Sequence, residues 1–279
     1  MKIAVCFSGV LRAGVHAFPN IKQYYGDYFN SIDFYMHTWD IEDWGADWYA
    51  YPHPLIDDSL WESIVKRKPF KLQDSKLDKM ESLYKFKKLE TASIFDSYDP
   101  NTPVKYEYMW DSFKRSVELK QEYEKENNFK YDIVVKTRPD ILFNVPFENT
   151  VRNKIRTGTS SFEYSTFEND VKLVQPDNIV AINCKYDQPG RTLDDVHWMG
   201  SNKVMDNLAD FSTNTEPITP WDPGYSSYLS QKTWRSGTYC DAKGVKFCEA
   251  NSQEYIILRD HLVHLDPIED YYKIKWEGY

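Results

Sequence analysis

The stretch Tyr131–Phe143 constrains the fold most, because it joins a buried strand to charged residues. Ile133, Val134 and Val135 form a continuous apolar run, which is typical of a strand covered on both faces in a parallel sheet between helices. Pro139 cannot donate to a central ladder of backbone hydrogen bonds, so we expect the strand to stop there. The stretch predicts an α/β sheet whose carboxyl edge carries charged side chains, and open α/β sheets bind ligands at that edge.

Three charged residues, Lys136, Arg138 and Asp140, follow this strand. Two interpretations are open for them. They bind a ligand at the carboxyl edge, or Arg138 and Asp140 form a local salt bridge where the strand turns into a loop.

Two other apolar runs end in polar residues in the same way, which favours the ligand-binding interpretation. One leads into a Ser8-Gly9 turn with Arg12 beyond it, and the other leads into His37 and Thr38. Gly9 lets the backbone approach a ligand closely, and a turn that feeds a helix directs free N–H groups at an anion. We expect all three strand ends to meet at one edge of the sheet.

Hydrophobic spacing predicts the remaining elements. Strands are expected at residues 3–7, 32–36 and 179–182, and helices at 59–65, 77–84, 106–117, 202–209 and 252–262. Strand, helix and strand in this order predict a right-handed, mainly parallel layout. The segment 144–177 is polar and irregular, and 214–244 has the composition of a long functional loop.

Composition excludes several classes of protein. With 279 residues, 41% of them hydrophobic and 28% charged, the chain can bury a substantial core, and wholesale disorder is not expected. The net charge of −9, without a long basic block, argues against a protein held on nucleic acid by charge alone. No stretch approaches the roughly 18 apolar residues of a membrane span, and no signal-like segment precedes the first strand, so we expect a cytoplasmic location.

Aromatic residues and cysteines are each open to two interpretations. The 9 Trp and 21 Tyr exceed what a core needs, so they either face a sugar or a base or lie at the edge of the core. The cysteines form no Cys-x-x-Cys pair and no zinc-site spacing, which predicts reduced thiols. The one bridge that the spacing leaves open joins Cys240 and Cys248.

Four motifs, taken in order, resemble those of the small GT-A-type glycosyltransferases of bacterial polysaccharide loci and of large-virus and phage genomes. They are Ser8-Gly9 with Arg12, His37-Thr38-Trp39, Lys136-Thr137-Arg138-Pro139-Asp140, and Asp194-Asp195 running to Gly200-Ser201. The resemblance implies a single α/β domain of GT-A type, with a mainly parallel sheet flanked by helices and a long loop insertion. Residues 1–143 would form the nucleotide-sugar-binding half, 144–265 the acceptor half, and 266–279 a C-terminal tail.

The resemblance also implies a donor site. A nucleotide-diphosphate sugar such as a UDP-sugar would lie across the carboxyl ends of the first strands, against Ser8, Gly9, Arg12, His37, Thr38, Lys136, Arg138 and Asp140. In GT-A enzymes an Asp-x-Asp motif holds a divalent metal on the diphosphate, and Asp140 stands where its last aspartate would be. Arg138 replaces the first carboxylate, so either Asp140 holds Mn²⁺ or Mg²⁺ with fewer protein ligands, or the arginine partly replaces the metal. His264 is then either a further metal ligand or a structural residue.

The acceptor and the catalytic base are expected in the second half of the chain. An inverting enzyme needs a carboxylate to take the proton of the acceptor hydroxyl, and Asp194 and Asp195 are the candidates, unless they only flank a strand. We expect a hexosyl- or pentosyltransferase whose acceptor is a surface glycan. One alternative is a phage-type DNA glycosyltransferase acting on a hydroxymethylated base, for which the loop 232–246 supplies basic and aromatic residues. The other is a non-catalytic sugar-binding module, which would not need Arg138 or Asp140.

Overall fold

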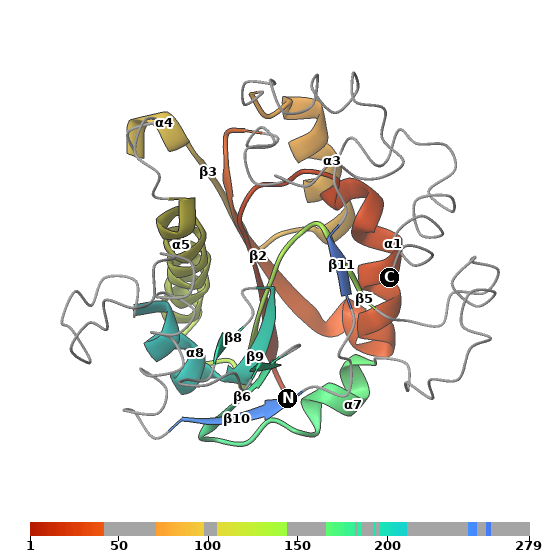
Figure 1. Cartoon of the computed structure of the whole chain (residues 1–279), viewed down its shortest axis with the longest axis vertical. Coiled ribbons are helices and arrows are strands. Elements are labelled where there is room, and N and C mark those ends of the chain that lie inside the picture. Colours follow the sequence, from red (N-terminus) through yellow and green to blue (C-terminus); the bar gives the residue numbers. More distant parts are fainter. Residues whose placement is uncertain are drawn as a thin grey trace.

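A computed structural model describes residues 1–41, 71–97, 105–143, 166–181, 184–185, 192–193, 196–210, 245–249 and 255–257 of the chain. Its main element is a seven-stranded sheet of order β10-β6-β9-β4-β1-β2-β3 (Figure 1). The strands are β1 (Ile3–Ser8), β2 (Ile32–Trp39), β3 (Lys88–Ala92), β4 (Ile133–Thr137), β6 (Asn178–Ala181), β9 (His197–Ser201) and β10 (Lys246–Glu249). Two small antiparallel pairs stand apart, β5 (Ile141–Phe143) with β11 (Tyr255–Ile257), and β7 (Cys184–Lys185) with β8 (Thr192–Leu193).

The sheet is mostly parallel. Strand β1 pairs in parallel with β2 and β4, β2 with β3, and β6 with β10. Strand β9 runs antiparallel between β4 and β6. The prediction of an α/β protein with a mainly parallel sheet flanked by helices is therefore confirmed.

Helices cover both faces of this sheet, as Figure 1 shows. Helices α5 (Lys105–Glu126) and α8 (Asn202–Ala209) pack on one face. The other face carries α1 (Gly14–Tyr25), η1 (Gly26–Ser31), α3 (Asp74–Tyr84) and α7 (Phe167–Val171), and the short α4 (Ile94–Ser97) follows β3. No helix within the described ranges is long and apolar enough to cross a membrane.

Alternating side chains of the central strands pack into two separate hydrophobic cores, one on each face of the sheet. In β1, Ile3, Val5 and Phe7 join the core under α1 and α3, whereas Ala4 and Cys6 join the core under α5 and α8. Every residue of β1 is buried, as expected for a strand covered on both faces. The Cys6 thiol is free, as predicted, and burial raises its pKa to about 12.

The structure corrects some of the expected elements. Residues 255–257, which the spacing placed inside a helix, form strand β11 instead, because they pair with β5. The segment 144–177 contains α7, whose Thr166 accepts a hydrogen bond from the Asn169 backbone at the start of the helix. The expected helices at 77–84, 106–117 and 202–209 are present as α3, α5 and α8. The helix expected at 59–65, the loop at 214–244 and the Cys240 thiol lie outside the described residues.

Candidate functional site

The register of the sheet brings the predicted strand ends to one edge. Ser8, the last residue of β1, lies opposite His37 of β2, and Phe7 lies opposite Thr137 at the end of β4. Strand β9 runs the other way, so its first residue, His197, also lies at this edge, opposite Thr137. We call it the carboxyl edge, after the ends of β1, β2 and β4.

Beyond this edge, two arginines hold one aspartate. Arg138 donates from Nε to Asp140 Oδ1 at 2.9 Å and from Nη2 to Oδ2 at 2.8 Å, and Arg12 Nη1 donates to the same Oδ2 at 3.2 Å. Asp140 is fully buried, while the Arg12 and Arg138 side chains remain 11% and 16% exposed. The local salt bridge that the sequence left open is therefore present. Arg12, which comes from the loop after β1, extends it into a three-residue cluster.

Unusual backbone geometry places Arg12 in that cluster. Arg12 has φ 45°, a left-handed conformation that is uncommon for a residue other than glycine. A Cβ built at Gly14 would lie 3.1 Å from Pro139 Cβ and 3.2 Å from the Pro139 carbonyl oxygen, so only glycine lets α1 sit this close to the 138–140 turn. The arginine cluster is thus built onto the first turn of α1.

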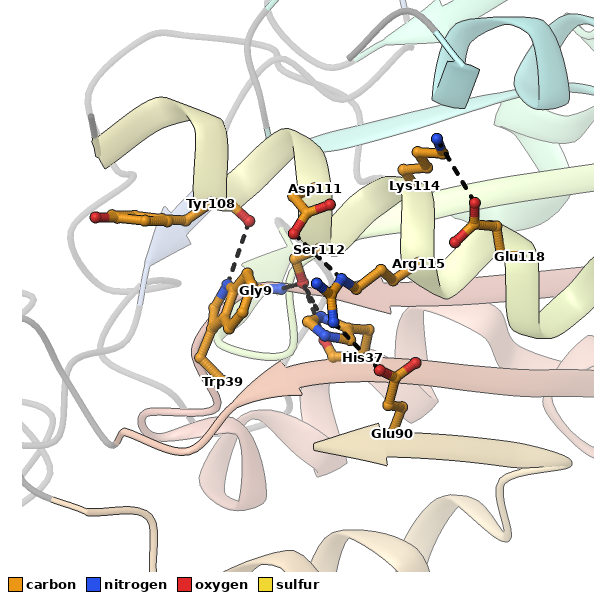
Figure 2. Close-up of polar contacts among 10 residues, drawn as sticks. All are labelled: Gly9, His37, Trp39, Glu90, Tyr108, Asp111, Ser112, Lys114, Arg115 and Glu118. Atoms are coloured by element: carbon orange, nitrogen blue, oxygen red, sulfur yellow. Dashed lines mark hydrogen bonds and ion pairs between the residues drawn. The ribbon is translucent and has the colours of Figure 1, made fainter. Parts of the chain in front are cut away.

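A serine of α5 links the Gly9 turn to His37 (Figure 2). Ser112 Oγ accepts the Gly9 N–H at 2.7 Å, donates to the His37 carbonyl at 3.1 Å and lies 2.8 Å from His37 Nδ1. Because the hydroxyl has one hydrogen and gives it to the carbonyl, Nδ1 must carry a proton, and Nε2 is left as a bare acceptor. Burial, together with the charge of Arg115, lowers the pKa of His37 to about 3, so this imidazole is neutral at pH 7.

Other contacts of α5 hold the same strand ends in place (Figure 2). Arg115 Nε binds Asp111 at 3.1 Å, its Nη1 binds Glu90 of β3 at 3.3 Å, and its guanidinium lies 5.5 Å from the ring centre of Trp39. Trp39 Nε1 in turn donates to the Tyr108 carbonyl at 3.2 Å. Trp39 is 1% exposed, so the interpretation of the aromatic residues as core residues holds for it.

The remaining strand-end residues divide between the two faces of the sheet. Lys136 is fully buried on the α5 face, with Nζ 4.6 Å from the ring centre of Trp198. Thr38 and Thr137 are also fully buried. Because successive side chains of a strand alternate, they lie on the α1 face, away from His37.

Four buried polar atoms at the carboxyl edge have no hydrogen-bond partner among the residues that the structure describes: Ser8 Oγ, His37 Nε2, Thr137 Oγ1 and His197 Nδ1. A buried donor or acceptor without a partner costs about 1–3 kcal/mol, so such atoms are few in a folded protein and call for an explanation. A ligand that enters at this edge would supply the missing partners.

Several predicted residues cannot be placed. Asp194, Asp195 and His264 lie outside the described residues, as does most of the loop 232–246. Within the described part of the chain, no group of three His, Cys, Asp or Glu residues could hold a metal ion. Sequence reasoning missed Ser112, because a serine among the buried aromatic residues of an amphipathic helix gives no signal that it contacts two strand ends.

The comparisons with known proteins add no family to this description. No protein-family model matches the chain, and no curated protein matches it. The geometry of the carboxyl edge therefore carries the functional argument.

Proposed function

We propose that the protein is a GT-A-like glycosyltransferase that moves a hexosyl or pentosyl group from a nucleotide-diphosphate sugar, such as a UDP-sugar, to a hydroxyl of a glycan. The observation that carries the proposal is the meeting of Arg12 and Arg138 at the carboxyl edge, next to the Gly9 turn. Guanidinium groups suit phosphate oxygens because they donate two parallel, charge-assisted hydrogen bonds. In open α/β sheets this edge is also where ligands bind.

In this proposal the arginines stabilise the departing diphosphate. Asp140 bonds to both guanidinium groups and orients them before the ligand arrives, so little reorganisation is needed when negative charge develops on the leaving group. The Gly9 turn would lie against the nucleotide, with Ser8 and His37 supplying a hydroxyl and a neutral nitrogen acceptor. Asp194 or Asp195 would take the proton of the acceptor hydroxyl.

The geometry around Asp140 favours the arginine alternative over a metal. Both carboxylate oxygens already accept hydrogen bonds from guanidinium groups, and Mn²⁺ or Mg²⁺ would have to displace at least one of them. The described residues therefore do not fit a divalent-metal site at Asp140. We propose that the charge of Arg12 and Arg138 takes the place of the metal in donor binding, and that His264 is not required for it.

The test compares nucleotide binding in Arg12→Gln, Arg138→Gln and Asp140→Asn with binding in the wild type, by titration calorimetry and by the shift in melting temperature. We expect each arginine substitution to weaken UDP binding at least about tenfold, because a charge-assisted hydrogen bond to phosphate is lost. Binding of uridine, which lacks the phosphates, should hardly change. The matched control is Lys172→Gln, which removes an exposed lysine that follows α7 and whose partner is Glu168 of that helix.

Two further measurements test whether a metal is required and whether the protein is a catalyst. UDP should bind equally well in EDTA and in Mn²⁺ or Mg²⁺, whereas a requirement for metal would restore the metal-binding interpretation. Release of UDP from a UDP-sugar would exclude a non-catalytic sugar-binding module. If Arg138→Gln and Asp140→Asn lower the melting temperature by similar amounts and leave UDP binding intact, the cluster is only a corner of the fold.

A further inference from the structure

A second buried polar cluster lies at the carboxyl edge, on the α1 face of the sheet. Tyr24 of α1 donates its hydroxyl hydrogen to Asp170 Oδ2 at 2.8 Å, and its oxygen lies 3.4 Å from His197 Nε2. All three side chains are buried. Because Tyr24 has one hydrogen and gives it to Asp170, His197 Nε2 must be the donor to the Tyr24 oxygen. His197 Nδ1 is then a bare acceptor.

Aromatic packing fixes the orientation of this imidazole. The His197 ring stands nearly perpendicular to the rings of Tyr24 and Phe143, with centroid distances of 5.6 Å and 5.0 Å. Tyr24 itself stacks on Phe143 at 3.8 Å. Asn20 accepts from the Phe143 backbone N–H at 2.7 Å and donates to its carbonyl at 3.1 Å, which ties β5 to α1. Tyr24 and Phe143 together hold the imidazole in place.

Thr137 adds a second polar atom at the same position. It is the cross-strand neighbour of His197, and neither Thr137 Oγ1 nor His197 Nδ1 has a partner within the described ranges. The Cβ atoms of directly opposed residues lie about 4.5–5.5 Å apart, so one small group can contact both side chains.

The chemistry of the two atoms defines that group. Burial, together with the charge of Lys136, lowers the pKa of His197 to about 3, so the imidazole is neutral at pH 7 and can only accept at Nδ1. The threonine hydroxyl can both donate and accept. A hydroxyl group satisfies both atoms, whether it belongs to an alcohol or to a water molecule that an alcohol displaces, whereas an ionised carboxylate has no hydrogen to give to the imidazole, and neither has a fully ionised phosphate.

We propose that His197 and Thr137 form a subsite for one hydroxyl of a sugar, with His197 oriented by Tyr24 and Asp170. The inference deepens the proposed function and rests on it for the source of the sugar, which is either the transferred group of the donor or the acceptor glycan. His197 and Thr137 would then be specificity-determining residues, and Tyr24 and Asp170 positioning residues.

Three variants of the full chain distinguish the contributions of Thr137 Oγ1 and His197 Nδ1 to sugar binding. Thr137→Val keeps the shape of the side chain and removes the hydroxyl. His197→Gln keeps an amide near the place of Nε2 and loses the Nδ1 acceptor, whereas His197→Asn keeps an amide near Nδ1 and loses the contact with Tyr24. We would titrate each with UDP, with the UDP-sugar that the wild type binds best among UDP-glucose, UDP-galactose and UDP-N-acetylglucosamine, and with the free sugars.

We expect Thr137→Val and His197→Gln to weaken sugar binding about tenfold, and His197→Asn to weaken it less. Loss confined to the UDP-sugar, with UDP unchanged, assigns the hydroxyl to the donor, and loss confined to the free sugars assigns it to the acceptor. Thr137→Val should melt at the wild-type temperature or above, because its hydroxyl has no partner to lose. A lower melting temperature overturns the subsite, because it would show that the hydroxyl serves the fold.

The two proposals can fail separately. If UDP binds and neither Thr137→Val nor His197→Gln changes sugar binding, the subsite is wrong and the proposed function stands. If UDP does not bind but free sugars do, and the variants weaken them, the proposed function is wrong and the subsite stands. Absence of both UDP and sugar binding in the wild type overturns both.

Discussion

A buried polar cluster between α5 and α8 differs from the carboxyl edge in how its polar groups are paired. At the edge where β4 begins and β9 ends, the fully buried Lys120 binds Asp206 at 2.6 Å, Glu124 at 3.3 Å and also Asn202 Oδ1. Glu124 further accepts from Lys130 at 2.7 Å and from the Tyr131 backbone N–H at 2.9 Å. At the carboxyl edge, by contrast, four buried polar atoms have no partner among the described residues.

Two tyrosine hydroxyls of the core under α1 and α3, those of Tyr25 and Tyr84, also have no partner among the described residues, so such atoms are concentrated at the carboxyl edge but not confined to it. Helices α5 and α8 supply the buried Lys120 with three oxygen partners from the protein's own side chains. Buried polar groups that stabilise the fold have hydrogen-bond partners within the protein in this way. Groups that bind a ligand lack a partner until the ligand is bound. The comparison yields three tests beyond those of the binding proposals.

The largest effect is expected from Lys120→Met, which removes the cation and leaves Glu124 and Asp206 facing each other across the helix interface. Stripping one partner from a buried ion pair costs about 3–5 kcal/mol of unfolding free energy. Urea denaturation at pH 7 measures it. Lys172→Met is the control, since exposed pairs such as Lys172 with Glu168 contribute less than about 1 kcal/mol. A loss for Lys120→Met no larger than that of the control would remove the contrast between this cluster and the carboxyl edge.

The second test uses pH, because His37 and His197 are both buried as neutral imidazoles whose pKa is lowered to about 3. In the unfolded chain a histidine titrates near 6.5, so between about pH 6.5 and 3 the unfolded state binds more protons and stability falls as the pH falls. From pH 7 to pH 5 the loss should be about 2 kcal/mol for each histidine.

Substitution isolates this contribution. His37→Gln and His197→Gln should each reduce the loss between pH 7 and pH 5 by about 2 kcal/mol, since glutamine does not titrate. Comparing the two pH values within each variant removes any general destabilisation. An unchanged pH dependence in either buried variant would mean that this histidine binds its proton equally well in the folded and unfolded states, and that its pKa is not lowered by the fold.

The smallest effect is expected from a matched pair of serines, one at each edge. Ser201 accepts from the Val204 N–H at the start of α8 and donates to the Pro176 carbonyl at 2.9 Å, so Ser201→Ala should cost about 1 kcal/mol. Ser8 Oγ has no partner in the described part of the chain, so Ser8→Ala should change stability by less than about 0.5 kcal/mol, or raise it. Thermal and urea unfolding compare the two directly. Equal losses would show that Ser8 is as well bonded as Ser201.

The sequence predicts the parts of the fold that local patterns determine. The unbroken apolar runs of β1 and β4 indicate burial on both faces, and the aromatic stripe of α5 indicates a crossover helix. Strand β11 escapes this reasoning, because its pairing partner β5 lies more than 100 residues earlier in the chain. The short apolar stretch at 255–257 fits either a helix or a strand when it is considered alone.

The residues of the candidate site likewise fall into those that local patterns predict and those that they do not. Ser8, His37, Arg138 and Asp140 stand out because polar residues directly follow apolar strands. Ser112 cannot be recognised in this way, since it reaches Gly9 and His37 only after α5 packs on the sheet. The same holds for Asp170, which contacts Tyr24 across 146 positions of sequence. Local spacing carries no information about such contacts.

The place of β1 in the sheet has a consequence for how the chain folds during synthesis. This strand is made first, yet it lies between β2 and β4, and its pairing with β4 joins residues about 130 positions apart. At a translation rate of roughly 5–20 residues per second, β1 waits about 6–26 seconds for its second neighbour. During that time an apolar strand edge stays open to mispairing, so the nascent chain should depend on a chaperone that binds unfolded chains until β4 emerges from the ribosome.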